Sequence, residues 1–410
     1  MKVVVVGSGG REHALALVLA RHAEVVVTPG NPAIPGSVDT PVFDLVADGT
    51  VDLVVFGPEQ PLVAGHADQL RAMGVRVFGP GAEGAKLEGS KAYMKMIATD
   101  AGLPTAMWEA FTDASEAKDY LVTLRPPYVI KTDGLAAGRG VLVTDSLAEA
   151  ELDLEAKLGG TTFGESGRRI VIEEGLVGPE VSVFAICDGT RAVCLPAAQD
   201  FKRVGDGDAG PNTGGMGAWS PVVFVPDGFA DEVNRTFIEP TLAELTRRGI
   251  DFRGVLYAGL MLTADGPKLI EYNVRFGDPD SQVVLLRMTS DLAELLAAAA
   301  DGDLTAVPAP TFSDDAAVLV VAASEGYPVA PRTGDVIAGL DDAAAVDGVT
   351  ILAAGVRHDD DGTLVTAGGR VVNVVGRGVD AAHAREVAYE AMAKISWSGL
   401  HHRTDIAADG

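Results

Sequence analysis

The sequence predicts an α/β N-terminal part, then a larger α+β part, then a smaller unit of mixed β/α structure. Three observations indicate this order. Apolar runs alternate with helical spacing over 1–80, strand-like runs dominate 127–275, and a stretch rich in Pro and Asp at 301–315 precedes another strand-rich segment. A chain of 410 residues is long enough for two or three domains, each with its own core.

The N-terminal strands are expected to be four short apolar runs, each ending at Gly or Pro. They lie at 3–6, 24–28, 52–56 and 76–79. Helical spacing of apolar residues at 11–22 and 62–73 predicts helices between them, so this part is expected to form a parallel βαβ sheet. A ligand of such a sheet lies at the carboxyl ends of the strands, which here carry GSGGRE, TPGN and FGPEQP.

The central part is expected to contain a helix over 90–102, with Ser90 as its N-cap, and helices near 230–248 and 281–300. Its strands are expected in PYVIKT, GRGVLVT, RIVIEE, EVSVFAIC, RAVCLPAAQ, GVLYAGLML and KLIEYNV. The last part is expected to contain the strands VLVVAA, TILAAGV, TLVTAG and RVVNVVG, and then a helix. The predicted domains are therefore 1–100, 101–305 and 316–410, and the final helix covers 380–395.

The composition excludes some classes of partner. The formal net charge is −26, and such an acidic chain repels phosphate backbones and anionic lipids, so we expect neither nucleic acid nor a membrane as partner. Cys187 and Cys194 flank an Asp-Gly turn and are expected to lie on neighbouring strands as buried thiols, in a reducing compartment. No signal peptide or bilayer-spanning apolar stretch is evident, so we expect a cytoplasmic protein, and a monomer.

The first strand ends in GSGG, which raises the question of a dinucleotide fold. The dinucleotide fingerprint is G-x-G-x-x-G, with an acidic residue about 20 residues further on for the ribose. Gly7 and Gly9 fit it, but Glu12 stands at the third glycine, and the second strand ends in Thr28-Pro29-Gly30 without an acid. The turn still suits an anion at a helix N-terminus beside Arg11; the alternative is a plain strand-to-helix connection.

Two further glycine-rich stretches indicate bound phosphate or substrate. In KTDGLAAGRGV (131–141), the glycines allow backbone amides to fold over phosphates, although this is not a Walker loop. The stretch QDFKRVGDGDAGPNTGGMGAWSP (199–221) is long and lacks periodicity, which is typical of a functional loop. The alternatives are a structural turn for the first stretch and a disordered surface loop for the second.

A strand over KLIEYNVR would place Glu271, Asn273 and Arg275 on one face. A carboxylate, an amide oxygen and a guanidinium together resemble a clamp for Mg²⁺ and phosphate, because Mg²⁺ prefers hard oxygen ligands. The alternative is a solvated polar strand face, which explains poorly why polar residues continue into FGDPD.

Taken together, these stretches resemble the ATP-grasp superfamily and, within it, the glycinamide ribonucleotide synthetase family. The matching segments run in family order from residue 7 to residue 406, and they include GSGGREHAL, GPEQPLVAG, LEGSKAYMK, VIKTDGLAAGRGV, VIEEGLVGPEVS, QDFKRVGDGDAGPNTGGMGAWSP, IEYNVRFGDPDSQ and HHRTDI. The resemblance implies a pre-ATP-grasp N-terminal domain, an ATP-grasp domain with a mobile subdomain at about 120–190, and a C-terminal domain. It also implies a ligase of purine biosynthesis that uses ATP and Mg²⁺ or Mn²⁺ to join glycine to 5-phosphoribosylamine through glycyl phosphate.

The resemblance implies roles for particular residues. ATP would be bound by Lys91, Lys131, Gly138, Arg139, Gly140, Glu173, Glu174, Leu176 and Glu180, and the metal by Glu271 and Asn273. The substrates would lie against Gly10, Arg11, Asn31, Glu59, Lys202, Gly214, Gly215 and Arg370. The catalytic residues would be Lys131, Arg275, Asp200 and Asp278, of which the two aspartates are the candidates for a general base.

Two other hypotheses compete with this one. The first is an ATP-grasp carboxylate–amine ligase with a different acceptor, which the stretch 199–221 disfavours because it is specific to the narrower family. The second is a nucleotide-binding oxidoreductase built on the N-terminal turn, which the broken fingerprint disfavours.

Overall fold

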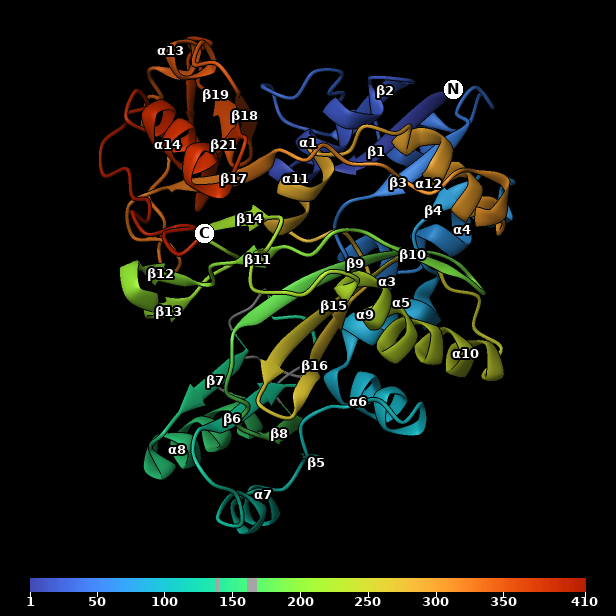
Figure 1. The fold of residues 1–410 in the computed structure, drawn as a ribbon, viewed down its shortest axis with the longest axis vertical. Coiled ribbons are helices and arrows are strands. Elements are labelled where there is room, and N and C mark those ends of the chain that lie inside the picture. Colours follow the sequence, from blue (N-terminus) through green and yellow to red (C-terminus); the bar gives the residue numbers. More distant parts are fainter. Residues whose placement is uncertain (137–139, 161–167) are drawn as a thin grey trace.

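The computed structural model describes residues 1–136, 140–160 and 168–410 of the chain (Figure 1). Figure 1 shows the N-terminal segment (blue) and the C-terminal segment (red) towards one end of the molecule. A teal segment that begins near residue 108 forms the opposite end, and the remaining strands lie between the two.

The N-terminal sheet is parallel throughout, as its alternating apolar runs predict. The elements are β1 (Lys2–Gly7), α1 (Gly10–Leu19), β2 (Glu24–Pro29), α2 (Val42–Leu45), β3 (Leu53–Phe56), α3 (Gln60–Val63), α4 (His66–Ala72), β4 (Val77–Phe78) and α5 (Ala82–Gly89). The strand order is β2-β1-β3-β4. The helix predicted over 62–73 is divided into α3 and α4 at Gly65, whose backbone φ of +79° favours glycine.

The teal segment in Figure 1 is an antiparallel sheet with an apolar cluster of its own. Its strands, in spatial order, are β5 (Trp108–Phe111), β8 (Ile170–Glu174), β6 (Tyr128–Thr132) and β7 (Val141–Thr144). The helices that pack on it are α6 (Lys91–Asp100), α7 (Ala114–Leu121) and α8 (Leu147–Leu158). As predicted, Ser90 caps α6, because its hydroxyl accepts a hydrogen bond of 3.1 Å from the backbone N–H of Tyr93.

The central sheet is also antiparallel. Its spatial order is β10 (Ala192–Cys194), β9 (Glu180–Asp188), β15 (Arg253–Thr263) and β16 (Gly266–Asn273). The helices beside it are α9 (Phe229–Val233), η3 (Asn234–Ile238), α10 (Glu239–Arg247) and α12 (Leu292–Asp301), whereas α11 (Asp280–Leu285) packs against α1 and the C-terminal sheet. The helix predicted over 281–300 is thus interrupted, since Asp291 caps α12 and starts a new helix.

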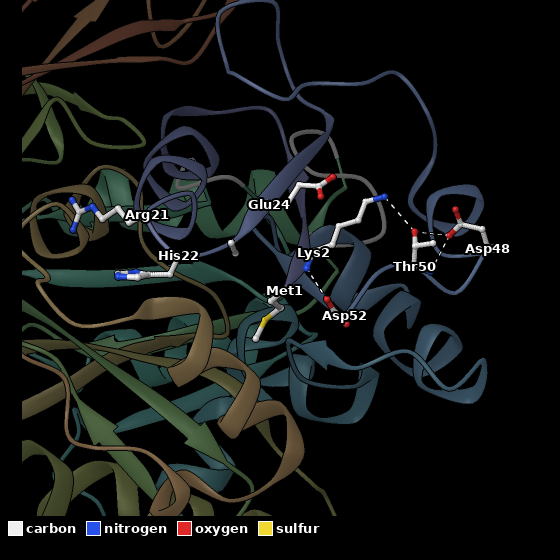
Figure 2. Close-up of a pocket in the computed structure, with 9 residues that line it drawn as sticks. Met1, Lys2, Arg21, His22, Glu24, Asp48, Thr50 and Asp52 are labelled. Carbon is white, nitrogen blue, oxygen red and sulfur yellow. Dashed lines mark hydrogen bonds between the residues drawn. The ribbon is translucent and has the colours of Figure 1, made fainter.

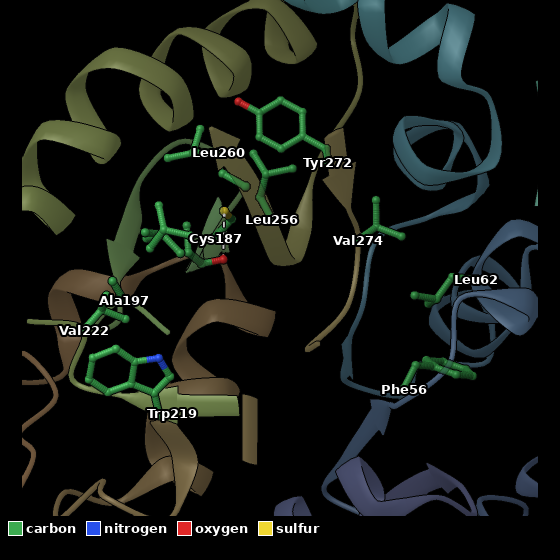
Figure 3. Close-up of a cluster of buried hydrophobic side chains, with 14 of the residues drawn as sticks. Phe56, Leu62, Cys187, Ala197, Trp219, Val222, Leu256, Leu260, Tyr272 and Val274 are labelled. Atoms are coloured by element: carbon green, nitrogen blue, oxygen red, sulfur yellow. Dashed lines mark hydrogen bonds between the residues drawn. The ribbon is translucent and has the colours of Figure 1, made fainter. Parts of the chain in front are cut away.

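Cys187 and Cys194 are free thiols, and they lie on the neighbouring strands β9 and β10, as predicted. Cys187 is buried, as predicted, whereas Cys194 is partly exposed. Burial raises the pKa of the Cys194 thiol to about 12, so it stays protonated at neutral pH. Figure 3 shows Cys187 in an apolar cluster that also contains Leu256 and Tyr272 of the central sheet and Phe56 of the N-terminal sheet. One continuous core therefore connects the two sheets.

The C-terminal sheet contains two strands that come from the centre of the chain. Its spatial order is β11 (Gln199–Asp200), β14 (Gly217–Ser220), β17 (Ala316–Ala323), β21 (Arg370–Gly378) and β18 (Val349–Ala353). The remaining elements are the hairpin of β12 (Arg203–Gly205) and β13 (Ala209–Asn212), the short helices η2 (Asp206–Asp208), η4 (Leu304–Ala306) and α13 (Leu340–Ala344), the strands β19 (Val356–His358) and β20 (Leu364–Thr366), and α14 (Ala381–Met392). The stretch 199–221 is therefore not a structureless loop but a set of short strands.

The N-terminal helix α1 contacts the C-terminal sheet through a buried histidine. His13 accepts a hydrogen bond of 2.8 Å at Nδ1 from the backbone N–H of Ala353. Burial lowers the pKa of His13 to about 4, and the accepted hydrogen bond requires an unprotonated Nδ1. In the folded protein, His13 is therefore a neutral imidazole at neutral pH.

We predict that this histidine makes the fold less stable in mild acid. Because the pKa of His13 is lower in the folded than in the unfolded chain, stability falls as the pH decreases from 6.5 to about 4. The loss in the free energy of unfolding amounts to at most about 3.5 kcal/mol, since each tenfold change in proton affinity corresponds to about 1.4 kcal/mol. Urea unfolding of the wild type and of His13→Asn at several pH values measures this loss in the free energy of unfolding. The difference between the two free energies of unfolding is expected to narrow towards pH 4, and a constant difference would contradict the prediction.

Candidate active site

A cavity of about 730 Å³ is lined by residues of the central sheet, of the C-terminal sheet, of the sheet that contains β6 and β8, and of the N-terminal part of the chain. The following residues proposed from the sequence line it: Arg11, Glu59, Lys91, Lys131, Gly140, Glu173, Glu174, Leu176, Glu180, Asp200, Lys202, Gly214, Glu271, Asn273, Arg275, Asp278 and Arg370. Gly138 and Arg139 lie outside the described residues. The structure therefore brings together side chains that are far apart in the sequence.

A second hollow of about 770 Å³ is open and lies at the other edge of the N-terminal sheet (Figure 2). Figure 2 shows Lys2, Glu24 and Asp52 around it, and these residues stand at or next to the amino ends of β1, β2 and β3. Ligands of parallel sheets bind at the carboxyl ends of the strands. The first cavity is therefore the better candidate for the active site.

Three of the proposed substrate residues are not in the lining of the candidate cavity. Gly10 starts α1 and lies against Asn373, whose Nδ2 is 2.1 Å from the position that a Cβ on Gly10 would occupy. The side-chain amide of Asn31 donates hydrogen bonds to the carbonyls of Ser8 (2.8 Å) and Ala354 (3.1 Å). Gly215 has a φ of +110°, and a Cβ there would lie 2.3 Å from Cδ of Pro279. Their proposed contacts with substrate stay predictions.

The two proposed phosphate lysines occupy different environments. Lys91, in the first turn of α6, donates a hydrogen bond of 3.4 Å to the carbonyl of Gly134. Nζ of Lys131, on β6, lies 2.7 Å from a carboxylate oxygen of Glu173 and donates a hydrogen bond of 3.3 Å to the carbonyl of Ile270. The other oxygen of Glu173 lies 2.8 Å from Nζ of Lys95, a residue that the sequence analysis did not select. Nothing in the local sequence distinguishes Lys95 from an ordinary helix lysine.

The other residues proposed to bind the nucleotide lie at the end of β8 or shortly after it. Glu174 accepts hydrogen bonds from the backbone N–H of Met107 (3.1 Å) and from Lys268 (3.3 Å). Leu176 lies in the connection from β8 to β9, and Glu180, at the start of β9, forms an ion pair with Lys202. Glu174, Leu176 and Glu180 all line the cavity, which is compatible with a flat base and a ribose lying beside them.

The proposed metal ligands stand on β16 and alternate as the strand pattern predicts. Glu271 and Asn273 line the cavity, whereas the hydroxyl of Tyr272 between them donates a hydrogen bond of 2.9 Å to the carbonyl of Phe237. Burial alone would raise the pKa of Glu271, but Lys202, Lys131 and other cations hold that pKa below its ordinary value. The carboxylate is therefore charged. Among the described residues, no three acidic, His or Cys side chains are grouped to hold a metal by themselves.

Arg275 lies beyond the end of β16, and two carboxylates fix its guanidinium. The strand ends at Asn273, two residues before the predicted face ends. Nη2 of Arg275 lies 2.9 Å from Glu88 and Nε lies 3.4 Å from Glu59. Burial raises the pKa of Glu88. At Arg275 burial acts in the other direction and lowers the pKa, but the negative charges of Glu88 and Glu59 outweigh it, so the pKa of Arg275 lies above its ordinary value. Glu88 carries no sequence signal for this role.

The residues proposed to bind the substrate glycine include a group of acidic side chains. Desolvation in the cavity raises the pKa of Asp200 to about 7; Lys202 opposes this increase, and Asp280 adds to it. Asp280, which the sequence analysis did not select, is 2 % exposed and lines the cavity. The carboxylate of Asp278 lies 3.1 Å from the guanidinium of Arg370, which also donates a hydrogen bond of 2.6 Å to the carbonyl of Gly214.

The C-terminal HHRTDI segment holds the hairpin β12–β13 in place. Arg403 is 1 % exposed and lies 2.7 Å from Asp208 and 2.7 Å from Asp405. Its guanidinium also lies 5.0 Å from the centre of the Phe201 ring, between Asp200 and Lys202 in the sequence. The segment therefore supports the residues that face the acidic part of the cavity.

Comparisons with known proteins agree with this arrangement. Three family models match the chain: Phosphoribosylglycinamide synthetase N domain over residues 1–88, its ATP-grasp (A) domain over 89–281, and its C domain over 317–409. The phosphoribosylamine–glycine ligase of Caulobacter vibrioides is 47% identical over 99% of this chain and 97% of its own length. That of Streptomyces coelicolor is 47% identical and covers 100% of this chain and 99% of its own length.

Solved structures show the same fold. The crystal structure of phosphoribosylamine–glycine ligase from Thermotoga maritima has a TM-score of 0.85 at 35% identity and covers 99% of this chain and 100% of its own. A biotin carboxylase from Campylobacter jejuni, at 16% identity and a TM-score of 0.72, covers 100% of this chain and 94% of its own and shares the fold. In the described part of the chain, no helix is both long and apolar enough to cross a membrane. The chain belongs to the phosphoribosylamine–glycine ligase family, the ATP-dependent carbon–nitrogen ligases of the ATP-grasp type in purine biosynthesis.

Proposed function

We propose that this chain joins glycine to 5-phosphoribosylamine and that ATP activates the glycine carboxylate. The carrying observation is the single cavity that brings together Lys91, Lys131, the pair Glu271 and Asn273, and the acidic group around Asp200. Cations beside a carboxylate–amide pair suit the phosphates of ATP, and the acidic group suits the ammonium of an amino acid.

We propose that Glu271 and Asn273 bind Mg²⁺ or Mn²⁺ together with ATP. Neighbouring cations hold the Glu271 carboxylate in its charged form, which fits a hard divalent cation, and Oδ1 of Asn273 accepts a hydrogen bond of 3.3 Å from Nη2 of Arg275. Such an ion would neutralise negative charge on the phosphate oxygens. A biotin carboxylase domain from Hydrogenobacter thermophilus with a TM-score of 0.74 was solved with its magnesium salt of ADP, which supports the same class of ligand here.

The first step that we propose is phosphoryl transfer to glycine. A carboxylate oxygen of glycine attacks the γ-phosphorus, the bond to the β-phosphate oxygen breaks, and ADP leaves. Lys131 and Arg275 stabilise the charge on the transferred group by position and electrostatics. Arg275 suits this role because Glu59 and Glu88 fix its guanidinium before substrate binds.

The second step that we propose is attack by the amine on glycyl phosphate. The nitrogen of phosphoribosylamine attacks the acyl carbon, the bond to the phosphate oxygen breaks, and the nitrogen loses a proton. We assign that proton to Asp200, because a pKa of about 7 matches the requirement of a general base at neutral pH. Arg11, Glu59 and Arg370 line the cavity where the phosphorylated amine would lie.

The remaining expectations stay proposals. The net charge of −26 supports small molecules rather than nucleic acid as partners. We also propose a monomer in the cytoplasm, with domains at 1–100, 101–305 and 316–410, and a subdomain near 120–190 that moves when ATP binds.

A substrate-dependence assay tests the proposed function. The purified protein is mixed with ATP, Mg²⁺, glycine and phosphoribosylamine, and ADP and phosphate are measured. We expect release of both products at rates that fall to background when either glycine or phosphoribosylamine is left out of the mixture. Turnover with another amino acid but not with glycine would favour a different ATP-grasp carboxylate–amine ligase.

A further inference from the structure

We infer that Lys95 is a positioning residue for ATP binding. It neutralises the Glu173 carboxylate, so that the positive charge of Lys131 is left to attract the phosphates of ATP. The inference rests on the proposed function, in which Lys131 contacts ATP. Lys95 does not line the cavity, and its effect would pass entirely through Glu173.

The three side chains form a continuous buried series of charges. Nζ of Lys95 lies 2.8 Å from one oxygen of Glu173, and Nζ of Lys131 lies 2.7 Å from the other. The side chains of Lys95, Glu173 and Lys131 are 0%, 4% and 5% exposed. Water therefore screens these charges little, and each strongly affects the others.

Both lysines are also tied to β16, the strand that carries the proposed metal ligands. Nζ of Lys95 donates a hydrogen bond of 2.8 Å to Oγ1 of Thr105, which in turn donates 2.7 Å to the carbonyl of Leu269. Nζ of Lys131 donates 3.3 Å to the carbonyl of Ile270. The position of Glu173 between them is thus fixed relative to the same strand.

The charges explain why a second lysine is needed. With Lys95, the three groups carry a net charge of +1, whereas Lys131 and Glu173 alone would form a neutral pair. A neutral pair attracts the polyanionic phosphates of ATP much less in a site that water does not screen. Lys95 thus converts an internally neutralised lysine into a net cation at the cavity wall.

A purely structural role does not explain a lysine at this position. Burial lowers the pKa of Lys95 to about 8, with Glu173 opposing this effect and the Lys131 cation adding to it. A buried ion pair is often no more stabilising than apolar side chains of similar volume. The charge is therefore retained at a cost in solvation, which points to a function for it.

The variant Lys95→Met tests the inference, because it keeps the volume and removes the charge. We expect the KM for ATP in the ADP-release assay to rise about tenfold, as follows from losing one nearby charge, while the KM for glycine changes less than about twofold. The matched control is Lys157→Met. Lys157, on α8, is also buried and paired with a carboxylate, that of Asp153, but it shares no carboxylate with Lys131.

A double variant separates charge from packing. If the Glu173 carboxylate neutralises Lys131 in Lys95→Met, then Lys95→Met is expected to change the KM for ATP less than about twofold when it is added to Glu173→Gln, which already lacks that carboxylate. A structural defect would instead raise the KM for ATP in both backgrounds. Should Lys95→Met fail to fold, as judged by circular dichroism, Lys95→Gln alone and with Glu173→Gln provides the same comparison.

A pH profile gives an independent readout. The charged groups that face Lys95 are Glu173 and Glu174 on β8 and Lys131 on β6. The KM for ATP in the wild type is expected to rise above about pH 8, and Lys95→Met is expected to lack this rise. An unchanged KM for ATP in Lys95→Met, or an equal change in Lys157→Met, would overturn the inference. Absence of wild-type turnover with glycine would instead refute the proposed function.

Discussion

Replacing Glu271 with Ala is expected to abolish metal-dependent release of ADP, with kcat lowered by about 10³-fold or more. The Glu271 carboxylate lines the cavity and is kept charged by cations, including Lys202 and Lys131. Alanine removes that charge and one of the two proposed metal ligands. Glu271→Gln retains the shape but not the charge and is expected to lose nearly as much activity.

The measurement is ADP release as a function of Mg²⁺ concentration. Glu109→Ala is a suitable control, because Glu109 is exposed on β5, an edge strand of its sheet, and does not line the cavity. If Glu271→Ala kept wild-type kcat and the same Mg²⁺ dependence, the assignment of the metal to Glu271 would be wrong.

Replacing Arg275 with Met is expected to lower kcat by about 10²- to 10³-fold, which is typical of losing one preorganised charge at a transition state. The guanidinium lies 2.9 Å from Glu88 and 3.4 Å from Glu59, so its position does not depend on bound substrate. Its removal also leaves the side chain of Glu88, which is 8% exposed, without its cation, so the variant is expected to unfold at a lower urea concentration.

Stability and catalysis are separated by a second change. Adding Glu88→Gln to Arg275→Met removes the uncompensated carboxylate and is expected to restore part of the urea midpoint but none of kcat. Single-turnover formation of ADP measures the chemical step directly. Recovery of kcat in the double variant would show that Arg275 acts through folding rather than on the transferred phosphoryl group.

The N-terminal fold could be predicted because its signals are local. Each of its strands is a short apolar run that ends at Gly or Pro, and the helices between them show the expected spacing. The C-terminal sheet could not be assembled in this way. β14 pairs with β17, about a hundred residues further along the chain, and β11 has only two residues, so neither carries a pattern that identifies its partner.

The candidate site shows the same division. Glu271 and Asn273 could be selected because alternation on a strand places them together, and the structure places both in the cavity. Lys95, Glu88 and Arg403 were missed, because each acts through a contact with a residue distant in the sequence. A single sequence indicates which residue types are present but not which buried charges meet.

The contacts of Arg403 have a consequence for the order in which the enzyme is made. This residue binds the carbonyl of Arg203 and the carboxylate of Asp208, which precede it by 200 and 195 residues. A ribosome synthesises Asp200 and Lys202 long before it reaches Arg403. A nascent chain that already contains the complete ATP-grasp segment therefore still lacks the support for the hairpin β12–β13, and it is expected to acquire ligase activity only once the HHRTDI segment has left the ribosome.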